Sequence, residues 1–408
     1  MKAVLLMCGL PGSGKSTWIK ENKLEPYSIS RDNLRLLYYG PLYNKYGLES
    51  MPYASEKLVY EEYMRIVEMR MRNNSFIVLD NTHLKVSSIN SIVNLAEYYG
   101  YKVFIKVMDT SVTECLRRNK GRESIKFVPE EVIIKMNRDY KNILNELNKL
   151  PVGLVNGMSK ISSYEFNCDH IPYLKSDTIY IVGDIHGCYN ELSKFLDDFE
   201  SSNDKNKILV FTGDYIDRGP ENLKVINKLI NISEDNSIES YFIEGNHEKS
   251  LYQYSYLREL FSKEFIDKTK PQLDKDPDLK LRLRSFLSKL HTHLLFKSEF
   301  TSNLVVCHGG ISWDKNVFDG NVFMSPESVI KGSDYPNGDM SKIAEDFNNI
   351  CSSNSIQFHG HRPVFDESGV ISHARTNQSV VNLDGHVDQG GHLLVAKVNN
   401  GNITILKY

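Results

Sequence analysis

The feature that most limits what this 408-residue chain can fold into is a glycine-rich segment near its start. Residues 9–16 read GLPGSGKS, which fits the pattern GxxxxGK(S/T), and they follow the apolar run Ala3–Cys8. The pattern requires a strand before it and a helix after it, because the glycines turn backbone N–H groups toward phosphate oxygens at the positive end of a helix. In such a loop Lys15 supplies a point charge and Ser16 can hold Mg²⁺. The segment therefore predicts an α/β domain that binds nucleotide phosphates.

The rest of the first 150 residues alternates short apolar runs with helical patterns. We expect further strands at Phe76–Asp80 and Val103–Met108, and helices at Ser55–Arg72 and Pro129–Leu150. The helix pattern places apolar residues three and four apart, and Pro129 suits a first helical turn. Strands that alternate with helices predict a parallel sheet wrapped by helices.

The regular alternation stops between Pro151 and Asp177, where Gly, Ser, Asn and Pro recur without a period. This change predicts a first domain at 1–155, a linker at 156–176 and a second domain at 177–408. Within the second domain, residues 249–295 are charged and predict a helical insert. The strands expected there are Ile179–Val182, Ile208–Phe211, Tyr241–Ile243, Leu304–Cys307, Ile356–Phe358, Val380–Leu383, Leu393–Val398 and Ile403–Leu406.

Five clusters of Asp, Asn and His residues each follow one of these apolar runs. They read GDIHG from residue 183, GDYIDRG from 213, GNHE from 245, HGG from 308 and HGHRP from 359. Since strand ends meet at one edge of a sheet, we expect the clusters to converge. Oxygen and imidazole ligands without a thiolate suit a pair of Mn²⁺, Fe or Zn²⁺ ions better than a structural zinc. Two ions about 4 Å apart can activate water and neutralise phosphate oxygens.

The first domain resembles the 5′-kinase domain of the phage-type polynucleotide kinase family. The resemblance rests on GLPGSGKSTW from residue 9, ISRDNLR from 29, FIVLDNT from 76 and RRNKGR from 117. It implies transfer of a phosphoryl group from ATP, with Mg²⁺, to a 5′-hydroxyl. The residues that it implies for ATP binding are Gly9, Gly12, Ser13, Gly14, Lys15, Ser16, Thr17, Arg118 and Arg122.

The same resemblance assigns roles to single residues. Asp32 is the general base, Arg35 holds the phosphate on the 3′ side of the acceptor, and Lys15 and Arg122 act on the transferred group. Asp80 has three open roles: it serves magnesium, orients Arg35 or caps a turn. By itself, an RDxxR stretch is more typical of an exposed helix start.

The second domain resembles the calcineurin-like metallophosphoesterase superfamily, and its motifs are closest to the serine/threonine-phosphatase branch. The resemblance implies an α/β fold in which a β-sandwich is flanked by helices. The implied metal ligands are Asp184, His186, Asp214, Asn246, His308 and His361. His361 is preferred to His359 because the family's ligand follows the glycine. The implied general acid is His247, oriented by Asp217, while Arg218 holds the substrate phosphate. The closing segment, VNLDG from residue 381, departs from the family's usual Asp-Thr-Gly because it lacks the threonine.

A kinase followed by a metallophosphoesterase resembles the first two modules of the bacterial polynucleotide kinase-phosphatase family of RNA repair proteins. The resemblance implies nucleic-acid end healing: phosphorylation of a 5′-OH end and removal of a 3′-phosphate or 2′,3′-cyclic phosphate. RNA is the favoured substrate, manganese is the favoured metal pair, and a separate RNA ligase is the expected partner because no ligase-like module follows residue 408.

Two other functions fit the same motifs. One is a kinase fused to a serine/threonine protein phosphatase or a dinucleoside-polyphosphate hydrolase, which the GNHE and HGG motifs favour. The other is a nucleotide-operated switch that regulates the phosphatase, although a switch needs neither Asp32 nor Arg35. The insert contains many basic residues, interleaved along its length with Tyr252, Tyr254, Tyr256 and Phe261, which suits either a single-stranded nucleic-acid surface or a tyrosine-lined core.

The composition is that of a soluble protein, with 41% hydrophobic and 25% charged residues and a net charge of −3. No apolar run approaches the length that spans a bilayer, so no membrane partner is expected. Six widely spaced cysteines without a CxxC pair predict reduced thiols and a cytoplasmic location.

Overall fold

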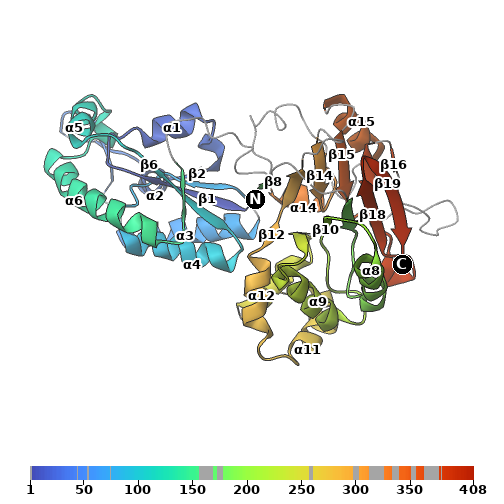
Figure 1. Cartoon of the computed structure of the whole chain (residues 1–408). Coiled ribbons are helices and arrows are strands. Elements are labelled where there is room, and N and C mark those ends of the chain that lie inside the picture. The colour runs from blue at the N-terminus through green and yellow to red at the C-terminus, as the bar shows by residue number, and fades with distance from the viewer. Residues whose placement is uncertain are drawn as a thin grey trace. The chain divides into compact units, whose positions relative to one another are not determined.

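The chain divides into two compact units, from Lys2 to Ile161 and from Ser162 to Tyr408 (Figure 1). A computed structural model describes residues 2–43, 45–52, 55–73, 75–155, 169–171, 178–256, 261–296, 303–311, 326–332, 340–350, 355–362, 376–377 and 379–408. Among these residues no helix is both long and apolar enough to cross a membrane.

The sheet of the N-terminal unit is parallel throughout. Its strand order is β2-β5-β1-β6-β7, and every neighbouring pair runs in the same direction. The strands are β1 Ala3–Cys8, β2 Ser28–Ile29, β5 Ile77–Leu79, β6 Lys102–Val107 and β7 Gly153–Val155. Every residue of the central strand β1 is buried, as expected for a strand covered on both faces. The phosphate loop leaves the carboxyl end of this central strand.

Helices connect the strands of this sheet, and serines begin three of them. The helices are α1 Lys15–Glu21, α2 Arg31–Tyr39, α3 Glu56–Arg72, α4 Val86–Tyr98, α5 Val112–Lys120 and α6 Glu130–Glu146, with a hairpin of β3 Leu42–Tyr43 and β4 Glu49–Ser50. The side chains of Ser30, Ser55 and Ser111 accept hydrogen bonds from the first turns of α2, α3 and α5. The predicted helix to Leu150 is shorter in the structure: α6 ends at Glu146 and a 3-10 turn follows.

The C-terminal unit contains two six-stranded sheets, with orders β12-β11-β10-β9-β18-β19 and β16-β17-β15-β14-β13-β8. The strands of the first are β9 Thr178–Val182, β10 Lys207–Phe211, β11 Glu239–Ile243, β12 Leu290–His291, β18 Leu394–Asn399 and β19 Asn402–Lys407. Those of the second are β8 Asp169–Ile171, β13 His293–Phe296, β14 Asn303–Cys307, β15 Ser355–His359, β16 Thr376–Asn377 and β17 Val380–Asn382.

The two sheets pack face to face around one apolar core. Ile181 and Val210 of the first sheet share this core with Leu304, Val306 and Phe358 of the second. The other face of the first sheet packs against helices, which gather beside it in Figure 1. These helices are α8 Tyr189–Ser201, α9 Asn222–Glu234, α10 Glu248–Ser255, α11 Lys270–Leu273 and α12 Leu279–Leu287, while α14 Pro326–Lys331 and α15 Met340–Ile350 lie further along the chain. The predicted fold class, a parallel α/β unit followed by a sandwich flanked by helices, is confirmed.

The predicted helical insert, 249–295, differs from the structure at its end. The last helix stops at Leu287, and residues 293–296 form β13, because Leu294 and Phe296 pack between the sheets. Residues 257–260 lie outside the described part of the chain.

The tyrosines of the insert lie in its core. The hydroxyl of Tyr252 donates to the Leu287 carbonyl (3.0 Å), and that of Tyr254 donates to Asp274 (2.9 Å). Both side chains are buried. Of the two predicted roles, a tyrosine-lined core fits Tyr252 and Tyr254, and a stacking surface made of these two residues does not. Arg258, one of the basic residues considered with them, lies outside the described residues.

The predicted linker, 156–176, is described only at residues 169–171. These three residues form β8, which pairs with β13 in the sheet of the C-terminal unit. They therefore belong to a folded sheet and not to a linker. Just before the linker, β7 adds an edge strand to the N-terminal sheet.

Candidate active sites

The phosphate loop is fixed between β1 and α5. Gly12 and Gly14 have φ values of +82° and +95°, which favour glycine because a Cβ crowds the backbone there. A Cβ on Gly12 would also lie 2.6 Å from the carbonyl oxygen of Cys115 in α5. The sequence therefore needs glycine here both for the turn and for the close approach of a helix.

Lys15 and Ser16 have partners at this loop. The Nζ of Lys15 donates to the carbonyl oxygens of Gly9 (3.0 Å) and Leu10 (2.8 Å). Burial lowers the pKa of Lys15 to about 8, although the charge of Asp80 opposes this. The Ser16 hydroxyl donates to Oδ2 of Asp80 (2.8 Å). Of the three open roles of Asp80, the hydrogen bond to Ser16 favours service to magnesium, because hydroxyl and carboxylate oxygens suit Mg²⁺.

The other predicted ATP-binding residues of the loop differ in exposure. Ser13 is buried, with its backbone N–H bonded to the Leu10 carbonyl at 3.1 Å. Thr17 lies exposed in the first turn of α1. Its hydroxyl is therefore accessible from solvent beside the loop.

Asp32 and Arg35 come together in the first turns of α2. Arg35 donates to Oδ1 of Asp32 through Nη1, and its Nε and Nη2 donate to Glu56 at 2.9 and 2.7 Å. Burial opposes the charge on Arg35, and the two carboxylates raise the pKa of its guanidinium. Asp32 remains accessible, with 65% of its side chain exposed. Glu56, at the start of α3, was missed by the sequence analysis because one Glu in a charged helix carries no distinguishing spacing.

The segment Arg117–Arg122, which resembles the arginine-bearing lid of the kinase family, carries Arg118 and Arg122 close to the charged groups of the phosphate loop. A Cβ on Gly14 would meet Nη1 of Arg118 at 3.4 Å, so Arg118 borders the phosphate loop. Burial lowers the pKa of Arg122, whereas the charges of Asp32 and Asp80 raise it. Arg122 therefore lies in the electric field of the two carboxylates of the site.

A buried asparagine holds the base of the lid. Asn119 is fully buried, and its amide donates to the Val128 carbonyl (2.7 Å) and accepts from the Val128 N–H (3.2 Å). These two bonds satisfy the amide on both sides. They join the end of α5 to the segment just before α6.

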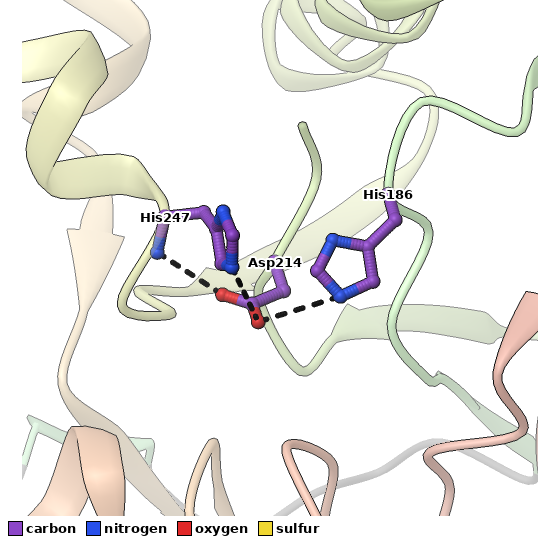
Figure 2. A group of neighbouring side chains, drawn as sticks. All are labelled: His186, Asp214 and His247. Carbon is purple, nitrogen blue, oxygen red and sulfur yellow. Dashed lines mark hydrogen bonds and ion pairs between the residues drawn. The ribbon is translucent and has the colours of Figure 1, made fainter. Parts of the chain in front are cut away.

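Asp214 lies at the centre of the C-terminal cluster. Its Oδ2 lies 3.6 Å from Nε2 of His186 and 3.8 Å from Nε2 of His247 (Figure 2). Oδ2 also lies 3.9 Å from Nδ1 of His361, and Oδ1 lies 3.2 Å from Nε2 of His308. The carboxylate of one residue thus faces imidazoles from four other loops, which is the position expected of a bridging ligand.

Two of these histidines are held in a defined tautomer. Nδ1 of His186 lies 3.0 Å from the Ile216 carbonyl, and Nδ1 of His308 lies 2.9 Å from the Thr212 carbonyl. A carbonyl only accepts, so each Nδ1 carries a hydrogen, and each Nε2 faces the Asp214 carboxylate. Metal-binding histidines are typically oriented in this way.

The remaining predicted ligands close the site. Oδ1 of Asn246 lies 3.3 Å from Nε2 of His308. Oδ2 of Asp184 accepts from the backbone N–H of His361 at 2.8 Å. A Cβ on Gly360 would lie 1.9 Å from Oδ1 of Asp184, so the loop at residue 360 requires glycine. The six predicted metal ligands, Asp214 among them, therefore lie together in one cluster.

His359 occupies a different place from His361. It is fully buried, its Nδ1 lies 2.9 Å from the Gly360 carbonyl, and its ring lies 3.3 Å from the Cβ that Gly310 lacks. Its ring therefore packs under the HGG loop, while His361 faces Asp214.

The predicted general acid and its orienting carboxylate lie beside this cluster. Nδ1 of His247 is 2.6 Å from Oδ2 of Asp217, whose Oδ1 accepts from the Thr269 hydroxyl. Burial opposes protonation, but Asp214 and Asp217 raise the pKa of His247 to about 9. The Arg218 side chain is partly exposed, and its Nε lies 3.7 Å from Oε1 of Glu264. The guanidinium group is therefore accessible to a substrate phosphate.

Glu248 is a further site residue, and the sequence analysis gave it no role. It is fully buried and accepts hydrogen bonds from the backbone N–H groups of Asp214 (3.0 Å), Tyr215 (2.9 Å) and Gly245 (2.7 Å). The Glu248 carboxylate thus fixes both the loop that begins at Gly213 and the loop that begins at Gly245. Its place as the last residue of the GNHE motif was the available signal.

The charges of the cluster fit divalent cations. His308 and His247 hold the pKa of Asp214 well below its usual range against the effect of burial. Burial and the charges of Asp384 and Asp214 raise the pKa of Asp184 well above its usual range. Three buried carboxylates in so small a volume repel one another, and cations between them relieve that repulsion. The donor set of oxygens and imidazoles suits such cations.

Comparison with known proteins agrees with this geometry. Residues 178–392, more than half of the 408, match the family described as calcineurin-like phosphoesterase. The chain belongs to the calcineurin-like phosphoesterase family. Members of this family use divalent metals, and the His and Asp cluster of this calcineurin-like phosphoesterase can hold them. Residues 4–143 match a second family, described as AAA domain, and with the phosphate loop they form a kinase-like unit.

Curated relatives match the phosphoesterase unit. An asymmetrical bis(5′-nucleosyl)-tetraphosphatase PrpE of Anoxybacillus flavithermus is 28% identical over 233 residues, covering 52% of this chain and 87% of that protein. A symmetrical bis(5′-nucleosyl)-tetraphosphatase of Wigglesworthia glossinidia brevipalpis is 33% identical over 138 residues, covering 33% of this chain and 46% of that protein. A solved protein serine/threonine phosphatase from Saccharomyces cerevisiae has a TM-score of 0.40 and 14% identity, covering 57% of this chain and 80% of that one.

Proposed function

We propose that this chain is a bifunctional nucleic-acid end-healing enzyme of the polynucleotide kinase-phosphatase type. The N-terminal unit phosphorylates 5′-OH ends with ATP and Mg²⁺. The C-terminal unit removes 3′-phosphate or 2′,3′-cyclic phosphate ends, with RNA preferred to DNA and a separate RNA ligase acting afterwards. The observation that carries the proposal is the accessible Asp32 carboxylate beside Arg35, in the same unit as the phosphate loop.

In the proposed kinase mechanism, the basic residues bind phosphate groups or neutralise their charge, and Asp32 accepts a proton. Lys15 and Arg118 bind the donor phosphates, and Arg122 offsets charge on the transferred group. Asp32 takes the proton from the attacking 5′-hydroxyl. Arg35 releases Glu56 and binds the phosphate that follows the terminal nucleoside of the acceptor.

In the phosphatase, Asp184, His186, Asp214, Asn246, His308 and His361 hold two divalent cations, manganese by preference. When bound, these cations activate water and neutralise phosphate oxygens. His247 protonates the leaving oxygen, and Asp217 orients the His247 ring through Nδ1. Arg218 binds the substrate phosphate from the partly exposed side of the site.

A second candidate function is dinucleoside-polyphosphate hydrolysis by the C-terminal unit. It is favoured by the names of the matched relatives, which are bis(5′-nucleosyl)-tetraphosphatases. One experiment separates the two functions. The full chain is incubated with ATP, Mg²⁺ and Mn²⁺, and offered an RNA with 5′-OH and 3′-phosphate ends or diadenosine tetraphosphate.

End healing predicts that both RNA ends are converted and that the RNA is turned over faster than the dinucleotide. Faster turnover of the dinucleotide, with an unchanged 3′-phosphate, would overturn the assignment of the phosphatase. An unchanged 5′-OH would overturn that of the kinase.

ATP binding is expected to weaken as pH rises above about 8. In the free protein, burial lowers the pKa of Lys15 to about 8, so the amine loses its proton above that pH. The phosphates of ATP favour the charged amine, so binding then takes up a proton. The association constant falls by up to about tenfold per pH unit. Calorimetric titration with ATP from pH 7 to 9.5 measures this slope.

Two variants serve as controls for this titration. Lys20→Met, which removes a lysine from the last turn of α1, should keep the slope. Lys15→Met should bind ATP weakly and without the slope. A wild-type affinity that stays constant across this range contradicts the prediction.

A further inference from the structure

The N-terminal unit contains a cavity of about 290 Å³ that no step above uses. It lies between the loop after β5 and helices α3, α4 and α6. Arg31, Asn81 and Lys85 line its polar part, and Tyr60 and Met136 contribute to its apolar part. This volume is close to that of the smaller ligand sites in proteins.

Two polar groups of the lining lack ordinary hydrogen bonds. Tyr63 is 3% exposed, and among the described residues neither its hydroxyl nor Nδ2 of Asn81 makes a hydrogen bond of ordinary geometry, although the Tyr63 hydroxyl interacts with the Asn81 side chain. Burial raises the pKa of Tyr63, so its hydroxyl stays neutral and can both donate and accept. Unsatisfied buried groups cost free energy unless a ligand or water satisfies them. Both groups line the cavity, and a ligand there can bond to them.

The neighbours of the cavity place it on the acceptor side of the kinase. Arg31 is adjacent in sequence to Asp32, and its N–H donates to Oδ1 of Asn81 (3.2 Å). Asn81 in turn follows Asp80, the partner of Ser16 in the phosphate loop. The cavity therefore begins where the proposed general base and the phosphate loop meet.

We propose that this cavity binds the nucleobase of the acceptor's 5′-terminal nucleotide. The ligand is a flat aromatic ring, which tyrosine and methionine side chains contact well, with a polar edge for the Tyr63 hydroxyl and the Asn81 amide. Arg31 and Lys85 supply positive charge toward the backbone phosphate. The proposal rests on the kinase function proposed above and adds that the kinase recognises the terminal base.

A blocking variant tests the site away from the catalytic groups. Ser88 lines the cavity from α4, so Ser88→Trp fills it with an indole. Ser87 lies next to it on α4, is exposed and is not part of the lining, so Ser87→Trp is the matched control. Thermal melting of both variants verifies that they are folded.

The first measurement is binding of the four nucleoside 3′-monophosphates to the full chain by calorimetry. Ser88→Trp should weaken this binding by about tenfold or more, since loss of one stacked base has an effect of that size. Ser87→Trp should not change it, and neither variant should change ATP binding. Equal nucleotide binding by the two variants overturns the proposal. A selective loss of ATP binding in Ser88→Trp also overturns it, because the cavity would then be a donor site.

The second measurement compares kcat/KM for 5′-OH oligonucleotides with a normal or an abasic 5′-terminal residue. Wild type should prefer the normal end by about tenfold, and Ser88→Trp should lose that preference. An active kinase that treats both ends equally overturns the base site while leaving the kinase in place. A chain without kinase activity that binds nucleotides in a Ser88-dependent way overturns the kinase while leaving the base site.

Discussion

Asp214→Asn is expected to reduce metal-dependent phosphate release by more than about 100-fold, because even residues that only support metal ligands cost up to that much when mutated. The asparagine keeps one oxygen but loses the charge that faces His186 and His308. A neutral amide oxygen is a weaker ligand for divalent cations than a carboxylate oxygen. Release of phosphate from a 3′-phosphorylated oligonucleotide and the manganese content of the purified protein measure the effect.

The backbone at this position makes asparagine a suitable replacement. Asp214 has a φ of +51°, a left-handed conformation that Asn tolerates better than other residues with a Cβ. Asp204→Asn is the matched control, since Asp204 pairs with Lys397 at 2.8 Å and is not among the ligands. Asp214→Asn should also leave 5′-phosphorylation intact. Near-normal phosphate release, or a loss of both activities together, would show that Asp214 is not the bridging ligand.

Asp32→Asn is expected to slow phosphoryl transfer to a 5′-OH end by about 10²–10⁴-fold, the usual contribution of a general base. ATP affinity should stay the same, because the phosphate loop and Arg118 are unchanged. Arg35 keeps its three hydrogen bonds to Glu56, so the local structure is retained. Transfer of labelled γ-phosphate to an oligonucleotide measures the rate.

The neighbouring Asn33 supplies a control for this change. It lies exposed in the same helical turn, and Asn33→Ala alters that turn without touching the Asp32 carboxylate. Asn33→Ala should keep near-normal activity. If Asp32→Asn is as active as Asn33→Ala, another group takes the proton and the assigned role of Asp32 is wrong.

The sequence predicted the parts of these sites that depend on fixed spacing. The loop from Gly9 to Ser16 stands directly after strand β1 of the N-terminal unit. The Asp, Asn and His clusters follow strands of two different sheets of the C-terminal unit, β9, β10 and β11 in one and β14 and β15 in the other. The expectation that all five meet at the edge of one sheet was therefore wrong, because their convergence around Asp214 also requires the two sheets to pack together.

Residues without a pattern could not be predicted in the same way. Glu56 acts through contacts with Arg35, which is distant in sequence, and a single Glu at a helix start resembles any exposed Glu. The strand β13, His293–Phe296, lacks polar alternation because all four of its residues are buried, so it resembled the end of a helix. The tyrosines of the insert lie in a segment rich in basic residues, yet tertiary contacts with Leu287 and Asp274 bury Tyr252 and Tyr254.

The pair of bonds between Asn119 and Val128 makes the lid segment a closed ring. The backbone N–H of Arg122 also donates to the Asn119 carbonyl at 3.2 Å, so Arg122 lies at the closed end of this ring. An insertion within residues 123–127 would therefore enlarge the ring on the far side of Arg122 and leave this arginine in place beside the phosphate loop.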